Sequence, residues 1–285
     1  MPGALRSAGL QLRTAQRLIR RGRGPLRTRL GPLDDRLVFV VGSPRSGTTF
    51  LGNSIGSLPG FIDLGEVAPL KAAIPELSQR PSEEAAVELR ALLAQTRRLG
   101  LVGSLRPVEQ TPESVFAAPA LALAFPDALF VHIVRDGRDV VCSLLERGWL
   151  SAERGGVDDA GHAYGSRARF WVEPERREEF ERAQDARRAA WAWRRYVTAA
   201  RAAARELGER AHEIRYEHLA ERPGEVAAAV ARFLAVPPDP LAAAFQAAHS
   251  TSVGRWQSEL SADQVADVED EAGALLTELG YLRSS

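Results

Sequence analysis

The chain is poor in the residues that build disulfides and metal sites. Cys142 is the only cysteine among 285 residues, which excludes an intrachain disulfide and a cysteine-based metal site. The five histidines have no spacing typical of metal ligands. We therefore expect no bound metal, and a reducing compartment such as the cytoplasm as the location of the protein.

Long apolar runs and an excess of one charge are also missing. No run of 18 or more apolar residues occurs, which argues against an ordinary transmembrane helix. Acidic and basic residues balance at 37 each, so net charge gives no reason to expect a nucleic-acid partner. Lys71 is the only lysine. The positive charge is therefore carried by arginine, whose planar fork suits phosphate and sulfate groups.

The first residues lack acidic side chains. No acid precedes Asp34, and eight arginines lie in the first 30 residues. The segment also lacks the apolar core of a secretory signal. We expect residues 1–35 to form a basic N-terminal arm, which docks on the domain or contacts an anionic membrane surface. Residues 36–285 are expected to form a single domain.

Apolar strand patterns alternate with helical patterns along the rest of the chain. This alternation predicts an α/β fold with a mainly parallel sheet, and such sheets bind ligands beyond the carboxyl ends of their strands. The expected strands are 37–41, 61–64, 129–134 and 212–216. The expected helices are 47–58, 83–99, 112–125, one starting near 136, 174–207, 224–235 and two more at the C-terminus.

The stretch LVFVVGSPRSGTTFL, residues 37–51, combines an apolar strand, a glycine-bounded loop and the start of a helix. Backbone N–H groups of residues 43–49 at a helix start form an anion site. Arg45 adds charge, and Thr48 and Thr49 add hydroxyl groups. The lysine that follows the second glycine in ATP-binding P-loops is missing after Gly47. An ordinary strand–turn–helix connection with incidental glycines is the alternative.

A second motif follows the strand 129–134. Arg135 comes just after the strand, Ser143 eight residues later, and Arg147 one helical turn beyond Ser143. Two guanidinium groups and a hydroxyl around one point bind a phosphate dianion strongly. In the alternative interpretation, Arg135 pairs with Asp136 or Asp139 and only caps the helix.

Two separate anion sites fit a nucleotide with one phosphate on its ribose and a modest anion at its 5′ end. Such a nucleotide has no γ-phosphate, so the missing lysine is not needed. This points to 3′-phosphoadenosine-5′-phosphosulfate (PAPS), the activated sulfate donor. The alternative of an ATP-dependent P-loop phosphotransferase is disfavoured because no lysine follows Gly47.

At these motifs the chain resembles PAPS-dependent sulfotransferases. GSPRSGTTF resembles their 5′-phosphosulfate loop, and RDGRDVVCS resembles their 3′-phosphate motif. IRYEHLAERPGEVAAAVARFLAV and GRWQSELSADQV resemble two further blocks, so the likeness runs from about residue 37 to 281. The motifs are most similar to those of tyrosylprotein and carbohydrate sulfotransferases. The resemblance implies a three-layer α/β/α fold with a P-loop-like phosphosulfate loop.

The resemblance also implies the function and the roles of the residues. The expected reaction moves a sulfonate group from PAPS to a hydroxyl or amine of a small-molecule, carbohydrate or lipid acceptor. Glu66, shielded from water, is expected to be the catalytic base, although it could instead only stabilise a helix N-terminus. The expected donor-binding residues are Ser43, Pro44, Arg45, Ser46, Gly47, Thr48 and Thr49 at the phosphosulfate, with Arg45 also catalytic; Arg135, Ser143 and Arg147 at the 3′-phosphate; and Tyr216 and Arg255 elsewhere on the nucleotide.

One block departs from the family pattern. Related enzymes carry a lysine near the transferring sulfonate, and VEQTPESV has Gln110 at that place. Gln110 can still donate a hydrogen bond to the sulfonate, while Arg45, another arginine, or Lys71 on a helix after Glu66 supplies the charge. A non-catalytic protein that binds the donor or its product is the alternative. The loop 148–170 is expected to be either an acceptor lid or an ordinary connection.

Overall fold

Five parallel strands form the centre of the molecule in the order β2-β3-β1-β4-β5. The computed structural model describes residues 35–99, 105–151, 169–248 and 250–283. Because every pairing is parallel, all five carboxyl ends meet at one edge of the sheet. The strands are β1 (Val38–Val41), β2 (Phe61–Gly65), β3 (Arg106–Glu109), β4 (Leu129–Val134) and β5 (Ala211–Arg215).

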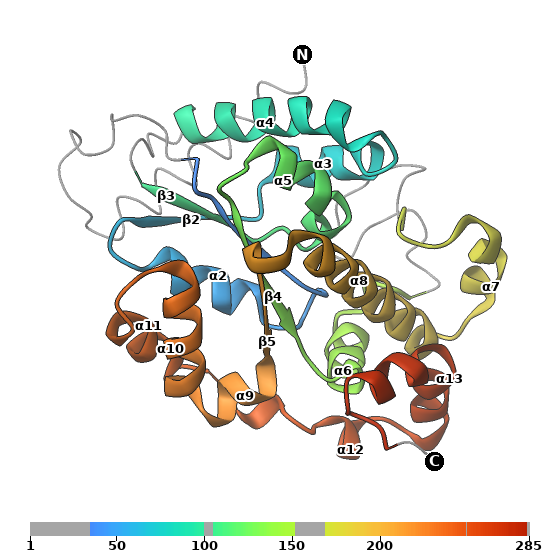
Figure 1. Cartoon of the computed structure of the whole chain (residues 1–285). Coiled ribbons are helices and arrows are strands. Elements are labelled where there is room, and N and C mark those ends of the chain that lie inside the picture. The colour runs from blue at the N-terminus through green and yellow to red at the C-terminus, as the bar shows by residue number, and fades with distance from the viewer. Residues whose placement is uncertain (1–34, 100–104, 152–168, 249, 284–285) are drawn as a thin grey trace.

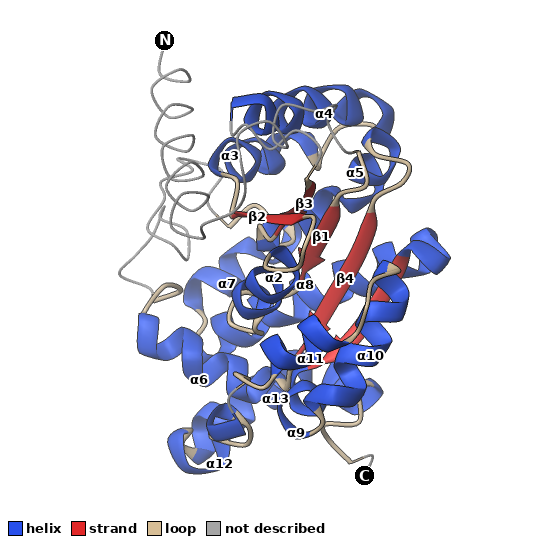
Figure 2. Cartoon of the chain, turned by 90° about the vertical axis from the view of Figure 1, so that its left-hand side faces the viewer, coloured by secondary structure: helices blue, strands red, loops and turns tan. Residues whose placement is uncertain are grey.

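Helices cover both faces of the sheet, which gives three layers (Figures 1 and 2). One face carries α2 (Thr48–Gly56), α10 (Pro223–Leu234) and α11 (Asp239–Phe245). The other face carries α3 (Ala68–Leu77), α4 (Ser82–Leu99), α5 (Ala118–Ala124), α6 (Gly137–Arg147), α8 (Asp185–Leu207) and α13 (Ala262–Glu278). Shorter helices are α7 (Arg177–Arg182), α9 (Tyr216–Glu221) and α12 (Trp256–Glu259). The predicted α/β/α architecture with a parallel sheet is therefore confirmed.

Strand β1 explains why an unbroken apolar run predicts a central strand. Phe39 and Val41 face the core under α4, α5 and α8, and Phe39 stacks on Phe130 at 5.0 Å between ring centroids. Val38 and Val40 face the opposite core under α2 and α10. Both faces of the strand are buried, so neither alternate position tolerates a polar side chain.

Some predicted elements differ from the structure. The helix expected over 174–207 is interrupted at Ala183 and Gln184, whose extended backbone (ψ 150° and 159°) separates α7 from α8. The helix expected over 112–125 starts as the 3₁₀ helix η2 (Pro112–Ala117) before α5. The strand expected to end at Tyr216 ends one residue earlier.

Strand β3 was not predicted. Its sequence, RPVE, has a proline in second place and charged residues at both ends, so it lacks the apolar pattern of a buried strand. It nevertheless pairs with both β1 and β2. β3 therefore separates β2 from β1 at the edge where the site lies.

Two predicted segments lie largely outside the described residues. They are the basic arm, residues 1–35, and most of the loop 148–170, so their roles stay predictions, as does the single domain over 36–285. Among the helices that the structure describes, none combines the length and apolar composition needed to cross a membrane.

Candidate active site

The loop after β1 is held in a conformation that needs glycine. Gly47 precedes α2 with φ 100°, and a Cβ there would come 2.9 Å from Cδ2 of Tyr216. Arg45 also has a positive φ of 71°, and the Ser46 N–H donates to the Ser43 carbonyl at 3.2 Å. The loop therefore closes tightly over the start of α2 and packs against the beginning of α9. No acidic residue lies in the first turn of α2, so the N-terminal end of that helix is free to favour an anion.

The second motif is held in place by helix α8. The turn between β4 and α6 begins with Arg135, whose carbonyl accepts a 3.0 Å hydrogen bond from Nε1 of Trp193 on α8. Gly137 lies so close to the Trp193 ring that a Cβ would come within 2.7 Å of it. The Asp136 carboxylate caps α6 by accepting from the Arg138 N–H at 2.9 Å. α6 therefore starts at a fixed place at the end of β4.

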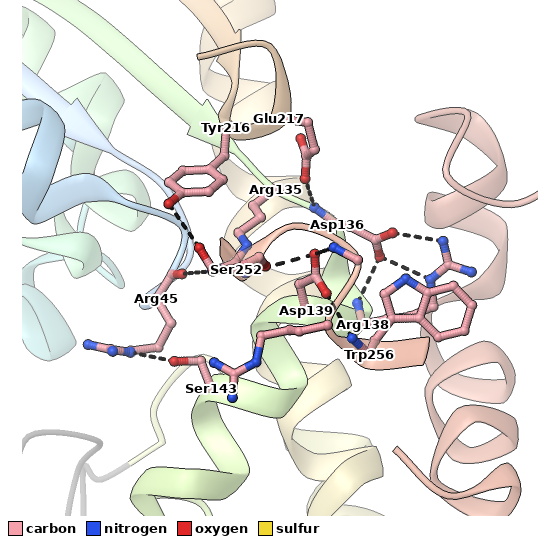
Figure 3. A network of polar contacts seen from close by, with 12 residues as sticks. Arg45, Arg135, Asp136, Arg138, Asp139, Ser143, Tyr216, Glu217, Ser252 and Trp256 are labelled. Carbon is pink, nitrogen blue, oxygen red and sulfur yellow. Dashed lines mark hydrogen bonds and ion pairs between the residues drawn. The ribbon is translucent and has the colours of Figure 1, made fainter. Parts of the chain in front are cut away.

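The two motifs meet in one cavity (Figure 3). Nε of Arg45 donates to the Ser143 hydroxyl at 2.9 Å, and Arg135 donates to the Arg45 carbonyl at 3.3 Å. A cavity of about 250 Å³ opens between them. Its lining includes Arg45, Gly47, Thr48 and Thr49 from the first motif, Arg135 and Ser143 from the second, and Tyr216 and Arg255. The structure thus brings most of the predicted donor-binding residues together.

Arg135 is a buried cation at this cavity, with only 5% of its surface exposed. Its guanidinium lies 4.8 Å from the centre of the Tyr216 ring and donates to the Ser252 carbonyl. The carboxylate of Asp139 lies 3.8 Å away, so the predicted alternative pairing exists, but at long range. Within the described residues, the Nε atom of Arg135 has no hydrogen-bond partner. Arg135 therefore keeps a free donor in a buried position.

Residues 250–259 form a strap that borders the cavity through Ser252 and Arg255. The Asp139 carboxylate accepts from the backbone N–H groups of Gly254 (2.8 Å) and Trp256 (3.1 Å), and burial raises the pKa of Asp139. The Arg138 guanidinium stacks on the Trp256 ring at 3.8 Å. Arg255 pairs with Glu259 and Glu146, which raise its pKa. Helix α6 therefore holds the strap through three residues, Arg138, Asp139 and Glu146.

Sequence reasoning missed three lining residues, Phe50, Ala248 and Ser252. Phe50 ends the GSPRSGTTF motif but has no polar side chain, and Ala248 and Ser252 lie outside the motifs. The hydroxyl of Ser252 lies 3.1 Å from that of Tyr216. Only the general likeness of GRWQSELSADQV pointed to this part of the chain.

Arg147 does not line the cavity. It is exposed near the end of α6, and its guanidinium lies 6.0 Å from the centre of the Trp149 ring. Arg45 lies 5.6 Å from the same ring. Burial and the nearby Arg147 charge lower the pKa of Arg45. Arg147 and Arg45 thus lie near the same tryptophan ring, but only Arg45 lines the cavity.

Three other predicted residues of this loop lie away from the cavity. Ser43, Pro44 and Ser46 are buried, and none of them lines the cavity. The Ser43 hydroxyl donates to the Pro44 carbonyl at 3.2 Å. The Ser46 hydroxyl oxygen is buried and has no partner among the described residues.

Glu66 lies just after β2, at the same sheet edge but two strands away from β1. Its carboxylate lies 3.1 Å from Nζ of Lys71, and its side chain is 40% exposed. The expectation that Glu66 is shielded from water is therefore wrong for this structure. The reason is that β2 is the outermost strand of the sheet, so the residue that follows it has a neighbouring strand on one side only.

Gln110 lies at the end of β3 and is 3% exposed. Its amide nitrogen lies 3.4 Å from the Asp63 carboxylate. A Cβ on Gly52 of α2 would come 2.5 Å from its amide oxygen. Gln110 is thus packed between β2 and α2 and does not line the cavity, so its contact with a sulfonate stays a prediction.

A family model described as the sulfotransferase family matches residues 103–240. Over these residues, nearly half of its length, the chain is similar to the sulfotransferase family. The matched range contains the Arg135–Ser143 motif and also α8, the helix that holds this motif in place. It does not include the loop after β1. The enzyme class predicted from the two motifs is confirmed. The closer likeness to tyrosylprotein and carbohydrate sulfotransferases stays a prediction.

Solved structures share the fold of this sulfotransferase. The sulfotransferase domain from the curacin biosynthetic pathway is 16% identical with a TM-score of 0.54, over 86% of this chain and 98% of that one. The domain from the Synechococcus PCC 7002 olefin synthase is 16% identical with a TM-score of 0.51, over 85% and 96%. A sulfotransferase from Mycobacterium tuberculosis H37Rv is 17% identical with a TM-score of 0.50, over 93% and 81%. The comparison with curated proteins found no match.

Proposed function

We propose that this sulfotransferase takes its sulfonate group from PAPS and transfers it in line to an acceptor hydroxyl or amine. The observation that supports this donor most strongly is the single cavity shared by two arginine-bearing motifs. It holds Arg45 and Thr48 at one side and Arg135 and Ser143 at the other. A donor with anionic groups at its 3′ and 5′ positions can meet both motifs at once.

At the ribose end, Arg135 and Ser143 bind the 3′-phosphate. Arg135 is buried and has an unpartnered Nε donor, and the Ser143 hydroxyl is 5% exposed beside it. A buried guanidinium without a full set of partners favours a charged acceptor strongly. Tyr216 and Arg255 border the same cavity and would contact the nucleotide there. Arg147, outside the cavity lining, would reach the phosphate only by a side-chain movement.

At the other end, the backbone N–H groups of the loop and the N-terminus of α2 bind the 5′-phosphosulfate. The hydroxyls of Thr48 and Thr49 line the cavity and serve as further donors. Ser43, Pro44, Ser46 and Gly47 set the shape of the loop. The family lysine of ATP-binding loops is not required, because this donor has no γ-phosphate.

The acceptor oxygen attacks sulfur as the bond from sulfur to the bridging phosphate oxygen breaks. Adenosine 3′,5′-bisphosphate leaves, and Glu66 takes the proton of the acceptor. Arg45 offsets the negative charge that grows on the leaving group. Glu66 fits this role because it lies at the same sheet edge as Arg45 and is accessible to an acceptor. The expected acceptors are small molecules, carbohydrates or lipids, in the cytoplasm.

Transfer of labelled sulfate from PAPS to a mixture of hydroxyl and amine acceptors tests this function. The wild-type protein should label at least one acceptor class, and Glu66→Gln should reduce labelling by about 100-fold or more, since a general base typically contributes roughly 100- to 10,000-fold. A melting-temperature assay tests the donor separately. Adenosine 3′,5′-bisphosphate should stabilise the protein without Mg²⁺, and ATP with Mg²⁺ should not. Stabilisation by ATP·Mg²⁺ alone would contradict the proposed donor.

A further inference from the structure

The only lysine of the chain lies in an unusual place. Lys71 is on α3 and is 5% exposed. Its Nζ atom lies between two carboxylates, 3.1 Å from Oε2 of Glu66 and 3.3 Å from Oε1 of Glu113. All other cationic side chains apart from histidine are arginines. A compact ammonium can sit between two carboxylates where the wide guanidinium fork of arginine needs more room.

The two carboxylates face different surroundings. The Glu113 side chain, on η2, is 2% exposed, whereas the Glu66 side chain is 40% exposed. Burial raises the pKa of Glu113, and the Lys71 charge opposes that rise. The Oε2 atom of Glu113 has no hydrogen-bond partner within the described residues. Lys71 is therefore the main stabilising contact of Glu113, and Glu113 fixes Nζ from the interior side.

Lys71, Glu66 and Glu113 form a charged triad. The other buried carboxylates of this region accept hydrogen bonds from groups outside the triad. Glu109, at the end of β3, is fully buried and accepts from the Thr111 N–H (2.8 Å) and the Ser114 hydroxyl (2.9 Å). Asp63 accepts from the Gly65 N–H at 2.7 Å. Glu66 is thus the one member of the triad that is open to solvent at the sheet edge, and Lys71 links it to the interior.

We propose that Lys71, anchored by Glu113, is the positioning residue that holds the Glu66 carboxylate in place for proton abstraction. This inference rests on the proposed function, in which Glu66 is the base. A glutamate with a half-exposed side chain samples several rotamers, and each rotamer that points away from the acceptor is unproductive. A buried ammonium at 3.1 Å restricts those rotamers.

Four variants test the inference: Lys71→Met, Lys71→Arg, Glu113→Gln, and the double variant Lys71→Met/Glu113→Gln. Lys71→Met should lower kcat by about 10- to 100-fold, because small displacements of a reacting group have effects of that size. The KM for PAPS should stay within about threefold, because Lys71 does not line the donor cavity. Lys71→Arg should recover part of kcat.

The double variant separates positioning from folding. Lys71→Met alone leaves a buried carboxylate without its cation and should lower the melting temperature. Adding Glu113→Gln removes that charge, so the double variant should regain stability while kcat stays low. Glu113→Gln alone should lower kcat less than Lys71→Met, since Lys71 still reaches Glu66.

Glu66→Gln distinguishes the two proposals. If Glu66→Gln abolishes transfer and the double variant keeps a wild-type kcat, the positioning role is overturned and the proposed function stands. If Glu66→Gln leaves kcat unchanged, Glu66 is not the base, and both the base assignment and this inference are overturned. Binding of adenosine 3′,5′-bisphosphate, measured by calorimetry, should be the same in every variant and confirms an intact donor site.

Discussion

The Nε atom of Arg45 lies 2.9 Å from the hydroxyl oxygen of Ser143, although 98 positions separate the two residues in the sequence. Arg45 belongs to the loop after β1, and Ser143 belongs to α6, which follows the neighbouring strand β4. Adjacent parallel strands therefore bring the two anion motifs to one place. Both motifs line one cavity, so substitutions in either motif should affect the same binding event.

The tight contact between the first loop and α9 gives one prediction. Gly47→Ala should lower the melting temperature more than Gly60→Ala. Both glycines have a positive φ (100° and 81°), so both substitutions introduce backbone strain of roughly 1–2 kcal/mol. Only at Gly47 would the new Cβ meet a neighbour, the Tyr216 ring at 2.9 Å, whereas nothing lies within 4 Å at Gly60. Equal losses in thermal denaturation would show that the loop has room to move.

The indole of Trp193 gives a second prediction. Trp193→Phe removes the hydrogen bond to the Arg135 carbonyl, and a buried carbonyl without a partner costs about 1–3 kcal/mol. Trp191→Phe is the matched control, because Trp191 is equally buried and donates to Glu173 at 2.7 Å, away from the cavity. Both variants should unfold at lower temperature, but only Trp193→Phe should weaken binding of adenosine 3′,5′-bisphosphate in calorimetry. Weaker binding in both would point to a general loss of structure.

The strap beside the cavity gives a third prediction. Asp139→Asn should speed hydrogen exchange at residues 250–259, because one amide oxygen cannot replace a carboxylate that accepts from both Gly254 and Trp256. Glu259→Gln is the control, since Glu259 contacts Arg255 but no backbone N–H in the strap. Exchange measured by mass spectrometry should rise in the first variant and change little in the second. Unchanged exchange in Asp139→Asn would mean that other contacts hold the strap.

The buried carboxyl of Glu109 predicts a pH effect on stability. Burial raises its pKa from 4.5 to about 7 in the folded protein. The folded state then keeps a proton that the unfolded state releases, so wild-type stability falls as pH rises through this window, by at most about 1.4 kcal/mol per pH unit. The amide side chain in the Glu109→Gln variant does not titrate, so this variant lacks the effect. Its melting temperature relative to wild type should therefore improve between about pH 5 and pH 8, and a constant difference would contradict the raised pKa.

Much of the fold and of the candidate site could be predicted because short-range patterns specify them. The apolar runs around Phe39 and Val131 identify buried strands, and the glycine-bounded loop and the Arg135-to-Ser143 spacing identify ligand positions at strand ends. Parallel pairing then brings them together without further information.

The remaining features depend on contacts that no local pattern encodes. β3 pairs with its neighbours despite a proline and charged ends, so only the sheet as a whole accounts for it. Exposure of Glu66 follows from the position of β2 at the sheet edge, which is a property of strand order. Lys71 pairs with Glu113, which lies 42 positions further along the chain and on a different helix.

Calorimetric titration with adenosine 3′,5′-bisphosphate tests the central claim most directly. The wild-type protein should bind one equivalent without Mg²⁺, and the double variant Arg135→Ala/Ser143→Ala should lose at least about 100-fold in affinity, since hydrogen bonds to charged groups contribute roughly 1.5–3 kcal/mol each. Replacing the exposed Arg80 by alanine should leave the affinity unchanged. No binding to the wild type, or equal binding to a folded Arg135→Ala/Ser143→Ala variant, would contradict a donor held between the two motifs.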